Sequence, residues 1–278
     1  MGKIGRGWQL AKMSLRIIRK DKEILVFPVL SGIITLLILA SFFVGTFFTM
    51  GGISGLEGSS SSWVVYAYFI VFYFVAFFVS IFFNACIIGC AMIRMNGGDP
   101  TIRDGVRIAG QNLGRILMWA LFTATVGLII RAIQERVGFI GKLIMGAIGV
   151  AWTIVTYFVV PVLIFEHVGP WTAVKRSASI LKGTWGEALV GNLGLGVIFF
   201  LAMLPGVIVL LLGIYGLVAW GIAAGIVILA LAIVYILMIG IIGSAAEAIL
   251  VAALYRFATT GQVSEEFRGF AFEKPFVT

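Results

Sequence analysis

Glu166 and His167 are adjacent, and His167 is the only histidine in the sequence. A carboxylate and an imidazole are common proton-transfer groups in enzymes. Neighbouring residues on a helix point in different directions, however, and one histidine cannot form a two-histidine metal site. The sequence also contains no GxSxG nucleophile elbow and no phosphate-binding Walker loop. We therefore expect no enzyme, no cofactor and no metal site, and we interpret the pair as capping or headgroup-contacting residues.

A second group of candidates consists of polar side chains within or beside apolar runs. An ionisable residue inside a membrane span is costly, so it is a functional hypothesis by default. Glu247 lies near the inner end of the last apolar run, where it could take part in transport or lie among headgroups beyond the hydrocarbon. A buried asparagine more commonly bonds a neighbouring helix, and outer charges can line a vestibule or extend to the interface. The transport candidates are Glu247, Asn84, Asn192, Arg131, Glu135 and Arg136.

The composition indicates that these candidates belong to a membrane protein. Of the 278 residues, 61% are hydrophobic and only 12% are charged, against about 25% charged in soluble proteins. Several apolar runs exceed the roughly 18 residues that a transmembrane helix needs. The polar segments between them are too short to form a core of their own. The sequence therefore predicts a polytopic membrane protein.

Six transmembrane helices account for the apolar runs, so the predicted fold is all-α. We expect one integral membrane domain over residues 1–278, with an N-terminal amphipathic helix in 1–23, the spans within 24–255 and a tail in 256–278. Tyr215 and Gly216 are expected to turn the chain between the last two spans. The predicted spans are residues 24–49, 63–93, 116–131, 143–165, 188–213 and 217–255.

The basic residues predict the orientation. The formal net charge is +8, and the alternate loops, counted with both termini, hold all 20 basic residues except Arg131, Arg136 and Lys142. Basic residues beside spans mark the cytoplasmic side. We therefore expect a multi-pass protein of the plasma membrane with both termini in the cytoplasm. The charge is accordingly explained by topology and anionic lipid, and no nucleic-acid partner is expected.

Three basic amphipathic helices, near residues 8–20, 100–112 and 170–182, each precede a predicted hairpin of two spans. Asp99 and Pro100 are expected to begin the second, and Gly183 to end the third. The arrangement is typical of a weak internal repeat, or simply of hairpins with cytoplasmic anchors. Such helices hold topology or attract anionic headgroups. Besides the basic N-terminal helix, the candidates for headgroup binding or assembly are Lys175, Arg176, Lys182, Arg103, Arg107, Glu166 and His167.

Small residues predict close helix packing. Gly221 and Gly225 form a small-xxx-small pattern in the last apolar run. Such a pattern lets two backbones approach closely. It does not distinguish a partner helix of the same chain from one of a second copy.

Several short motifs carry a resemblance to a known group. They are PVLIFE at 161–166, AVKRS at 173–177, LKG at 181–183, ALYR at 253–256, and FFN at 82–84 followed by GGD at 97–99. Over residues 60–260 the chain resembles a broad group of bacterial and archaeal polytopic membrane proteins, most without an assigned function. The group includes the membrane domain fused to some glycerophosphodiester phosphodiesterases. The resemblance implies the six-span fold and a cytoplasmic helix after the fourth span. It implies no phosphodiesterase activity, because that domain is not in this chain.

Two functions follow as hypotheses. The first is a non-enzymatic integral membrane protein that organises anionic lipids or partner proteins, as a homo-oligomer. The second is a channel or transporter for an ion or small solute, which depends on Glu247 and the other polar candidates.

Overall fold

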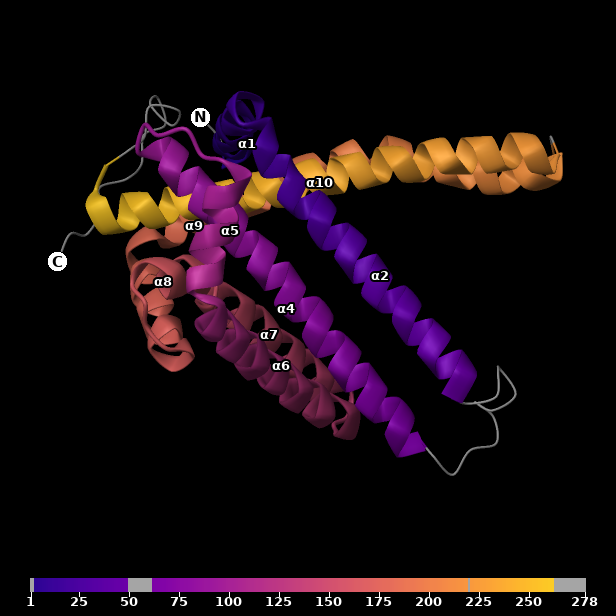
Figure 1. The fold of residues 1–278 in the computed structure, drawn as a ribbon, viewed down its shortest axis with the longest axis horizontal. Coiled ribbons are helices and arrows are strands. Elements are labelled where there is room, and N and C mark those ends of the chain that lie inside the picture. Colours follow the sequence, from indigo (N-terminus) through magenta and orange to yellow (C-terminus); the bar gives the residue numbers. More distant parts are fainter. Residues whose placement is uncertain (1–2, 50–61, 220, 263–278) are drawn as a thin grey trace. The chain divides into compact units, whose positions relative to one another are not determined.

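The structure is a computed structural model that describes residues 3–49, 62–219 and 221–262. All elements in these ranges are helical, and six helices are long and apolar enough to cross a membrane. This confirms the predicted all-α fold with six spans (Figure 1). The elements are α1 Lys3–Lys20, η1 Lys22–Leu25, α2 Val26–Thr49, α4 Ser62–Met95, α5 Ile102–Gln111, α6 Leu113–Arg136, α7 Phe139–Val155, α8 Val159–Phe165, α9 Pro170–Ala219 and α10 Ile222–Thr260.

The chain forms two compact units, each built from segments that are separated in sequence. The first contains Met1–Pro28, Cys90–Thr101 and the chain from Lys182 onward, and the second contains Val29–Gly89 and Ile102–Leu181. The long helices α2, α4 and α9 therefore each contribute to both units. The single membrane domain expected over residues 1–278 stays a prediction.

In the first unit, α9 and α10 form an antiparallel hairpin that is symmetric about Gly221. Gly225 packs against Leu217, Gly213 against Leu229, Gly206 against Tyr235 and Ile236, and Gly243 against Phe199. The two members of each pair lie equally far along the chain from Gly221, whose φ is +94°. In the Gly206 contact, Ile236 is the equidistant member. Without a side chain at one member of each pair, the two helices can approach closely over most of their apolar length.

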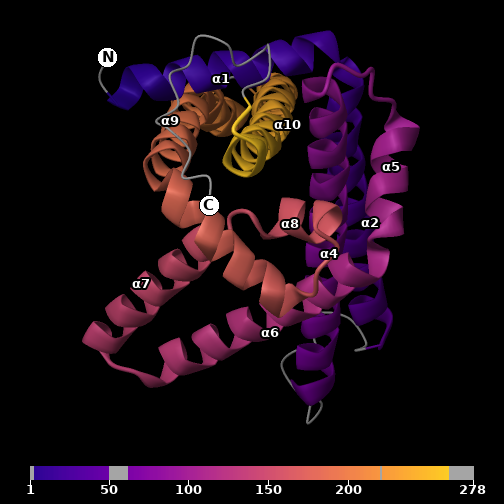
Figure 2. The ribbon, with the colours of Figure 1, turned by 90° about the vertical axis from the view of Figure 1, so that its left-hand side faces the viewer.

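The C-terminal part of α10, which is predicted to be cytoplasmic, lies in the core of the same unit. Helix α1 and η1 both pack against α10, and Figure 2 shows α1 crossing it. Met13, Ile17 and Ile18 are buried on α1, as are nearly all side chains of α10 from Ala245 to Phe257. By contrast, the part of α10 near Ile222 exposes large apolar side chains such as Leu231 and Leu237. Lipid is the environment that suits such a surface.

In the second unit, aromatic side chains join the helices. Phe42 of α2 lies 5.3 Å from Phe72 of α4 between ring centroids. Trp119 of α6 stacks on Trp152 of α7 at 6.2 Å. Helix α6 also packs against α5 and α8.

Four helix boundaries differ from those expected. Gly183 does not end a helix, because α9 continues from Pro170 to Ala219. Gly216 does not turn the chain, since α9 also runs past it. One glycine costs a helix only about 1 kcal/mol, which a long packed helix tolerates. Helix α6 extends through the outer charges to Arg136, and α5 begins at Ile102 rather than at Pro100.

The hairpin predicts opposite effects for two glycine-to-alanine substitutions. A Cβ atom on Gly225 would lie 2.6 Å from the backbone nitrogen of Leu217, whereas one on Gly196 would meet nothing within 4 Å. Gly225→Ala should destabilise the protein by about 1–3 kcal/mol through overpacking. Gly196→Ala should be neutral or stabilise it by up to about 1 kcal/mol. Denaturant unfolding in mixed micelles measures both, and equal stability of the two variants would contradict the close approach.

Candidate functional site

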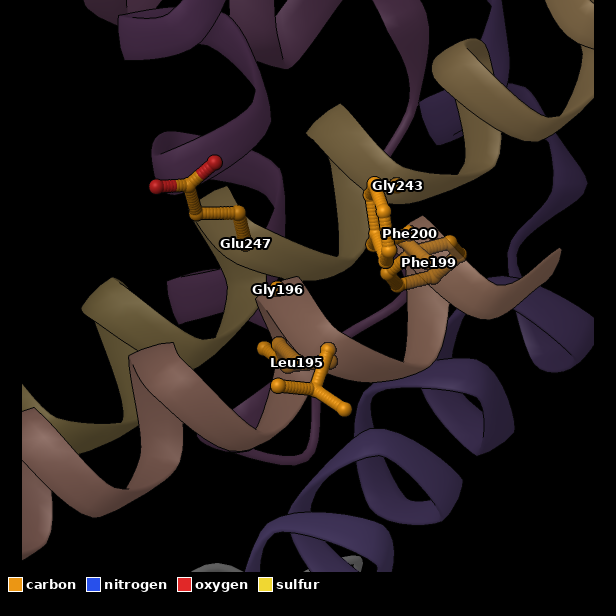
Figure 3. A pocket seen from close by; sticks show the side chains of 7 residues that line it. Leu195, Gly196, Phe199, Phe200, Gly243 and Glu247 are labelled. Atoms are coloured by element: carbon orange, nitrogen blue, oxygen red, sulfur yellow. The ribbon is translucent and has the colours of Figure 1, made fainter. Parts of the chain in front are cut away.

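A hollow of about 490 Å³ lies between α9 and α10 in the first unit. Glu247 supplies its one charged side chain among the described residues, and the remaining lining is apolar. In Figure 3, Phe199 and Phe200 lie beside Gly243, and Glu247 lies about one turn further along α10. The lining residues are Leu195, Gly196, Val197, Phe199, Phe200, Gly243 and Glu247. The hollow thus has an aromatic end and an acidic end.

The position of Glu247 along α10 places the acidic end near a bilayer surface. Glu247 lies roughly 38 Å along the helix axis from Ile222 at 1.5 Å per residue, and a bilayer core is about 30 Å thick. If the span begins at Ile222, the carboxylate lies just past the hydrocarbon. Its chain neighbours Ala246 and Ala248 are fully buried, so Glu247 lies at the start of the buried stretch of α10.

A break divides the fourth span into α7 and α8, where a continuous helix was expected over residues 143–165. Pro161 explains it, because proline has no N–H to bond the carbonyl of Tyr157 and its ring would clash with that carbonyl. Ser177 of α9 seals the break: its Oγ donates to the carbonyl of Val155 at 2.6 Å and accepts from the N–H of Phe158 at 3.0 Å. Ser177 itself is fully buried.

Asn112, between α5 and α6, holds the end of α8. Its amide nitrogen donates to the carbonyls of Ile108 at 3.0 Å and Ile164 at 3.4 Å. Its Oδ1 accepts from Arg115 at 2.8 Å and lies 3.0 Å from Nδ1 of His167. The buried amide thereby uses two donors and two acceptor positions. His167 has the left-handed φ of +56° that often follows a helix end.

Glu166 and His167 therefore do not act on one another. Glu166 accepts from Nε of Arg176 at 3.0 and 3.1 Å, whereas His167 is bonded to Asn112. Lys175, next to Arg176, lies 5.3 Å above the ring of Trp171, within cation–π range. The structural role is that of a helix connection in which Glu166 bonds α9 and His167 bonds the junction of α5 and α6.

An ion-pair cluster joins three segments of the first unit. Arg94 at the end of α4 donates through Nε and Nη2 to both carboxylate oxygens of Asp21, between α1 and η1, and through Nη2 also to Asp99. The side chain of Asp21 is 5% exposed and that of Asp99 is 91% exposed. A two-pronged contact of this kind positions both partners. Asp99 therefore pairs with Arg94 and is not the first residue of a helix.

A second hollow, of about 260 Å³, lies along α1. Its described lining is Lys12, Leu15, Arg16 and Arg19. The three cations share one side of the helix, opposite the buried Met13, Ile17 and Ile18. A metal site is not seen: the described ranges hold no cluster of three or more histidine, cysteine, aspartate or glutamate side chains.

A comparison with protein families matches residues 63–265 to a family of unknown function, DUF6159. The chain belongs to this family. No curated protein matches the chain. The DUF6159 segment includes Asn112, Ser177 and Glu247, and it excludes α1 and Asp21. The match supports a family of unknown function, and the six apolar helices fit a polytopic membrane protein. The match shows no link to glycerophosphodiester phosphodiesterases, so that likeness stays a prediction.

None of the other predicted residues is among the described lining of the hollow at Glu247. Asn84 is half-buried on α4, and the side chain of Asn192 lies outside the described residues. Arg131 pairs with Glu135 at 3.2 Å on the exposed surface of α6. Gly221 precedes α10, so it does not share a helix face with Gly225. The exposed cations of the remaining set are Arg136, Arg103, Arg107 and Lys182.

Three of the residues that organise the DUF6159 chain were not among the predicted functional residues. Ser177 is a serine in a basic helix, Asn112 a polar residue in a surface segment, and Asp21 an acid in a charged terminus. Pro161 inside an apolar run was the one available signal, since proline disrupts a helix. Locating its partner required the fold.

Ser177→Ala should destabilise the protein. The substitution leaves the carbonyl of Val155 and the buried N–H of Phe158 without their partner, at a cost of about 1–3 kcal/mol. Ser179→Ala is the matched control, because Ser179 is exposed on the same helix and should change stability by less than about 0.5 kcal/mol. Thermal unfolding in detergent measures both variants. A Ser177 variant as stable as the control would show that the break does not need this side chain.

Asp21→Asn should also destabilise, by on the order of 3 kcal/mol, because it leaves the mostly buried Arg94 without its main counter-charge. Asp99→Asn removes the other carboxylate from the same arginine and should cost less than about 1 kcal/mol, since the Asp99 side chain is exposed. Unfolding free energies of the two variants test the ranking. The reverse order would mean that Asp99 is the principal partner.

Proposed function

We propose that this protein is a non-enzymatic integral membrane protein that binds anionic lipid headgroups, with α1 as the principal contact. The observation that carries the proposal is the hollow lined by Lys12, Leu15, Arg16 and Arg19. Three cations around one leucine suit a phosphate group with the start of an acyl chain beside it.

The packing of α1 supports this reading. Met13, Ile17 and Ile18 are buried within the protein, and α1 packs on α10. The basic side is therefore held in place by the fold rather than by lipid. A preorganised set of cations loses less conformational freedom on binding than a mobile one.

Further exposed cations extend the proposed lipid contact. Arg103 and Arg107 are exposed on α5, and Lys175, Arg176 and Lys182 on α9. The positive-inside pattern predicts that these helices lie on the same side of the bilayer as α1. Each cation near an anionic membrane surface contributes about 1 kcal/mol. Arg176 and Arg107 each also pair with a carboxylate, which lowers what they offer to lipid.

Transport is the second candidate. Two observations favour it: a discontinuous span, which is where many transporters bind ions, and the carboxylate-lined hollow at Glu247. The break itself weighs against an ion site, since Ser177 already bonds the carbonyl of Val155 and the N–H of Phe158. We therefore place lipid binding first.

A homo-oligomer and partner proteins remain part of the proposal with less support. Gly225, predicted to pack against another helix, lies against Leu217 of the same chain. That close-packing signal is thus accounted for within one copy. The exposed apolar side chains of the spans suit lipid as well as a neighbouring subunit.

Replacing Lys12, Arg16 and Arg19 together by glutamine should reduce the binding of phosphatidylglycerol by on the order of 100-fold, because about 1 kcal/mol is lost per charge. Native mass spectrometry from nanodiscs with phosphatidylglycerol diluted in phosphatidylcholine measures the retained lipid. The binding should also weaken in high salt.

The matched control replaces Arg131, Arg136 and Lys142 by glutamine, which removes the same charge from the side predicted to be extracytoplasmic. All three are exposed, and this variant should retain wild-type lipid binding. Accessibility labelling of both purified variants establishes that their orientation is unchanged. If the two triple variants retain the same amount of lipid, the charges of α1 serve only to set the topology, and the proposal is rejected.

A further inference from the structure

We propose that the hollow at Glu247 binds a lipophilic ammonium ion, with its charged nitrogen at the carboxylate and its apolar body toward Phe199 and Phe200. This site is separate from the anionic-lipid contact on α1, shares no residue with it and attracts the opposite charge. This proposal can therefore be tested independently of the proposed function.

The chemistry of the lining defines the class of ligand. Among the described residues the hollow has one charged group, the Glu247 carboxylate, and no described lysine or arginine forms an ion pair with it. An anion would be repelled. A bare divalent cation such as Ca²⁺ needs six or more oxygen ligands, which a single carboxylate among apolar side chains does not supply. A monovalent organic cation needs one counter-charge and an apolar surface.

The aromatic end completes the match. Phe199 and Phe200 lie beside Gly243, and a Cβ atom on Gly243 would be 3.3 Å from the ring of Phe199. Aromatic rings contact apolar chains well and attract ammonium groups over their faces. A volume of about 490 Å³ is within the range of small-molecule sites.

The direction of the hollow fits the direction of an amphiphile in a bilayer. Phe199 and Gly243 lie closer than Glu247 to the Gly221 turn, so they are deeper in the predicted span. Glu247 is close to the headgroup level. A ligand whose nitrogen meets Glu247 therefore directs its chain toward the hydrocarbon, as a membrane lipid does.

Access from the membrane is open. Val197 and Phe200 are 50% and 63% exposed on α9, on a helix that lipid surrounds in the predicted topology. A ligand partitioned into the bilayer reaches the hollow sideways without crossing the protein. Two sources supply the required alkylammonium chemistry: a membrane lipid with an amine headgroup, or a free lipophilic amine.

The test uses the full-length protein in the non-ionic detergent dodecyl maltoside and dodecyltrimethylammonium as the probe, titrated calorimetrically. Glu247→Gln removes the charge at constant shape. Gly196→Leu adds bulk at a residue that lines the hollow, where a Cβ atom has nothing within 4 Å. Each variant should lower the affinity on the order of tenfold or more, from the loss of the charge or of the space.

Two matched controls exclude general effects. Glu135→Gln removes an exposed carboxylate of α6. Gly127→Leu adds a leucine to α6 at a glycine whose Cβ atom would also have nothing within 4 Å. Both should bind the probe like the wild type, as should the triple glutamine variant of Lys12, Arg16 and Arg19. Wild-type affinity in Glu247→Gln and Gly196→Leu, or no binding by the wild type, overturns the proposal.

A competition arm identifies the source of the ligand. Phosphatidylethanolamine added to the micelles should displace the probe if the site takes a lipid amine. Probe binding that is unaffected by this lipid, yet lost in both hollow variants, assigns the site to free lipophilic amines.

Discussion

The structure depends on one constraint: a backbone N–H or carbonyl inside a bilayer must find a partner within the protein. Unbroken helices meet this constraint along nearly the whole chain. At Pro161 the fourth span cannot, and one hydroxyl, that of Ser177, bonds both the carbonyl before the break and the N–H after it. A single side chain of α9 thus makes a proline tolerable in a span, and it joins α7 and α8 to α9 as it does so.

Connections between helices follow the same rule at the polar ends. Asn112 satisfies all of its amide groups while holding the last turn of α8, and its contact with His167 occurs at a residue in the left-handed region. Arg94 joins Asp21 and Asp99 from separate segments. These polar side chains therefore connect elements, whereas Glu247 lines a hollow.

Much of the fold was predictable because the length and hydropathy of a span depend on bilayer thickness. All six spans follow from that one quantity. Boundaries were less predictable where packing outweighs local preference: Gly183 and Gly216 continue a helix that the hairpin supports. The candidate site was predictable only in part. Glu247 is conspicuous as an acid in an apolar run, but Phe199 and Gly196 become its neighbours only through the register of two antiparallel helices.

The hairpin register also explains why the hollow lies where it does. From Gly221 inward, paired positions carry a glycine on one helix, and the helices stay close through Gly243 and Phe199. At the next turn the equidistant pair is Leu195 and Glu247, neither of them small, and Gly196 beside them has open space around it. A charged side chain at the end of a glycine-lined seam cannot be covered by the opposite helix, so the space between α9 and α10 opens there. The buried stretch of α10 begins close to the same position, so a carboxylate, aromatic rings and the start of the buried core lie at one place.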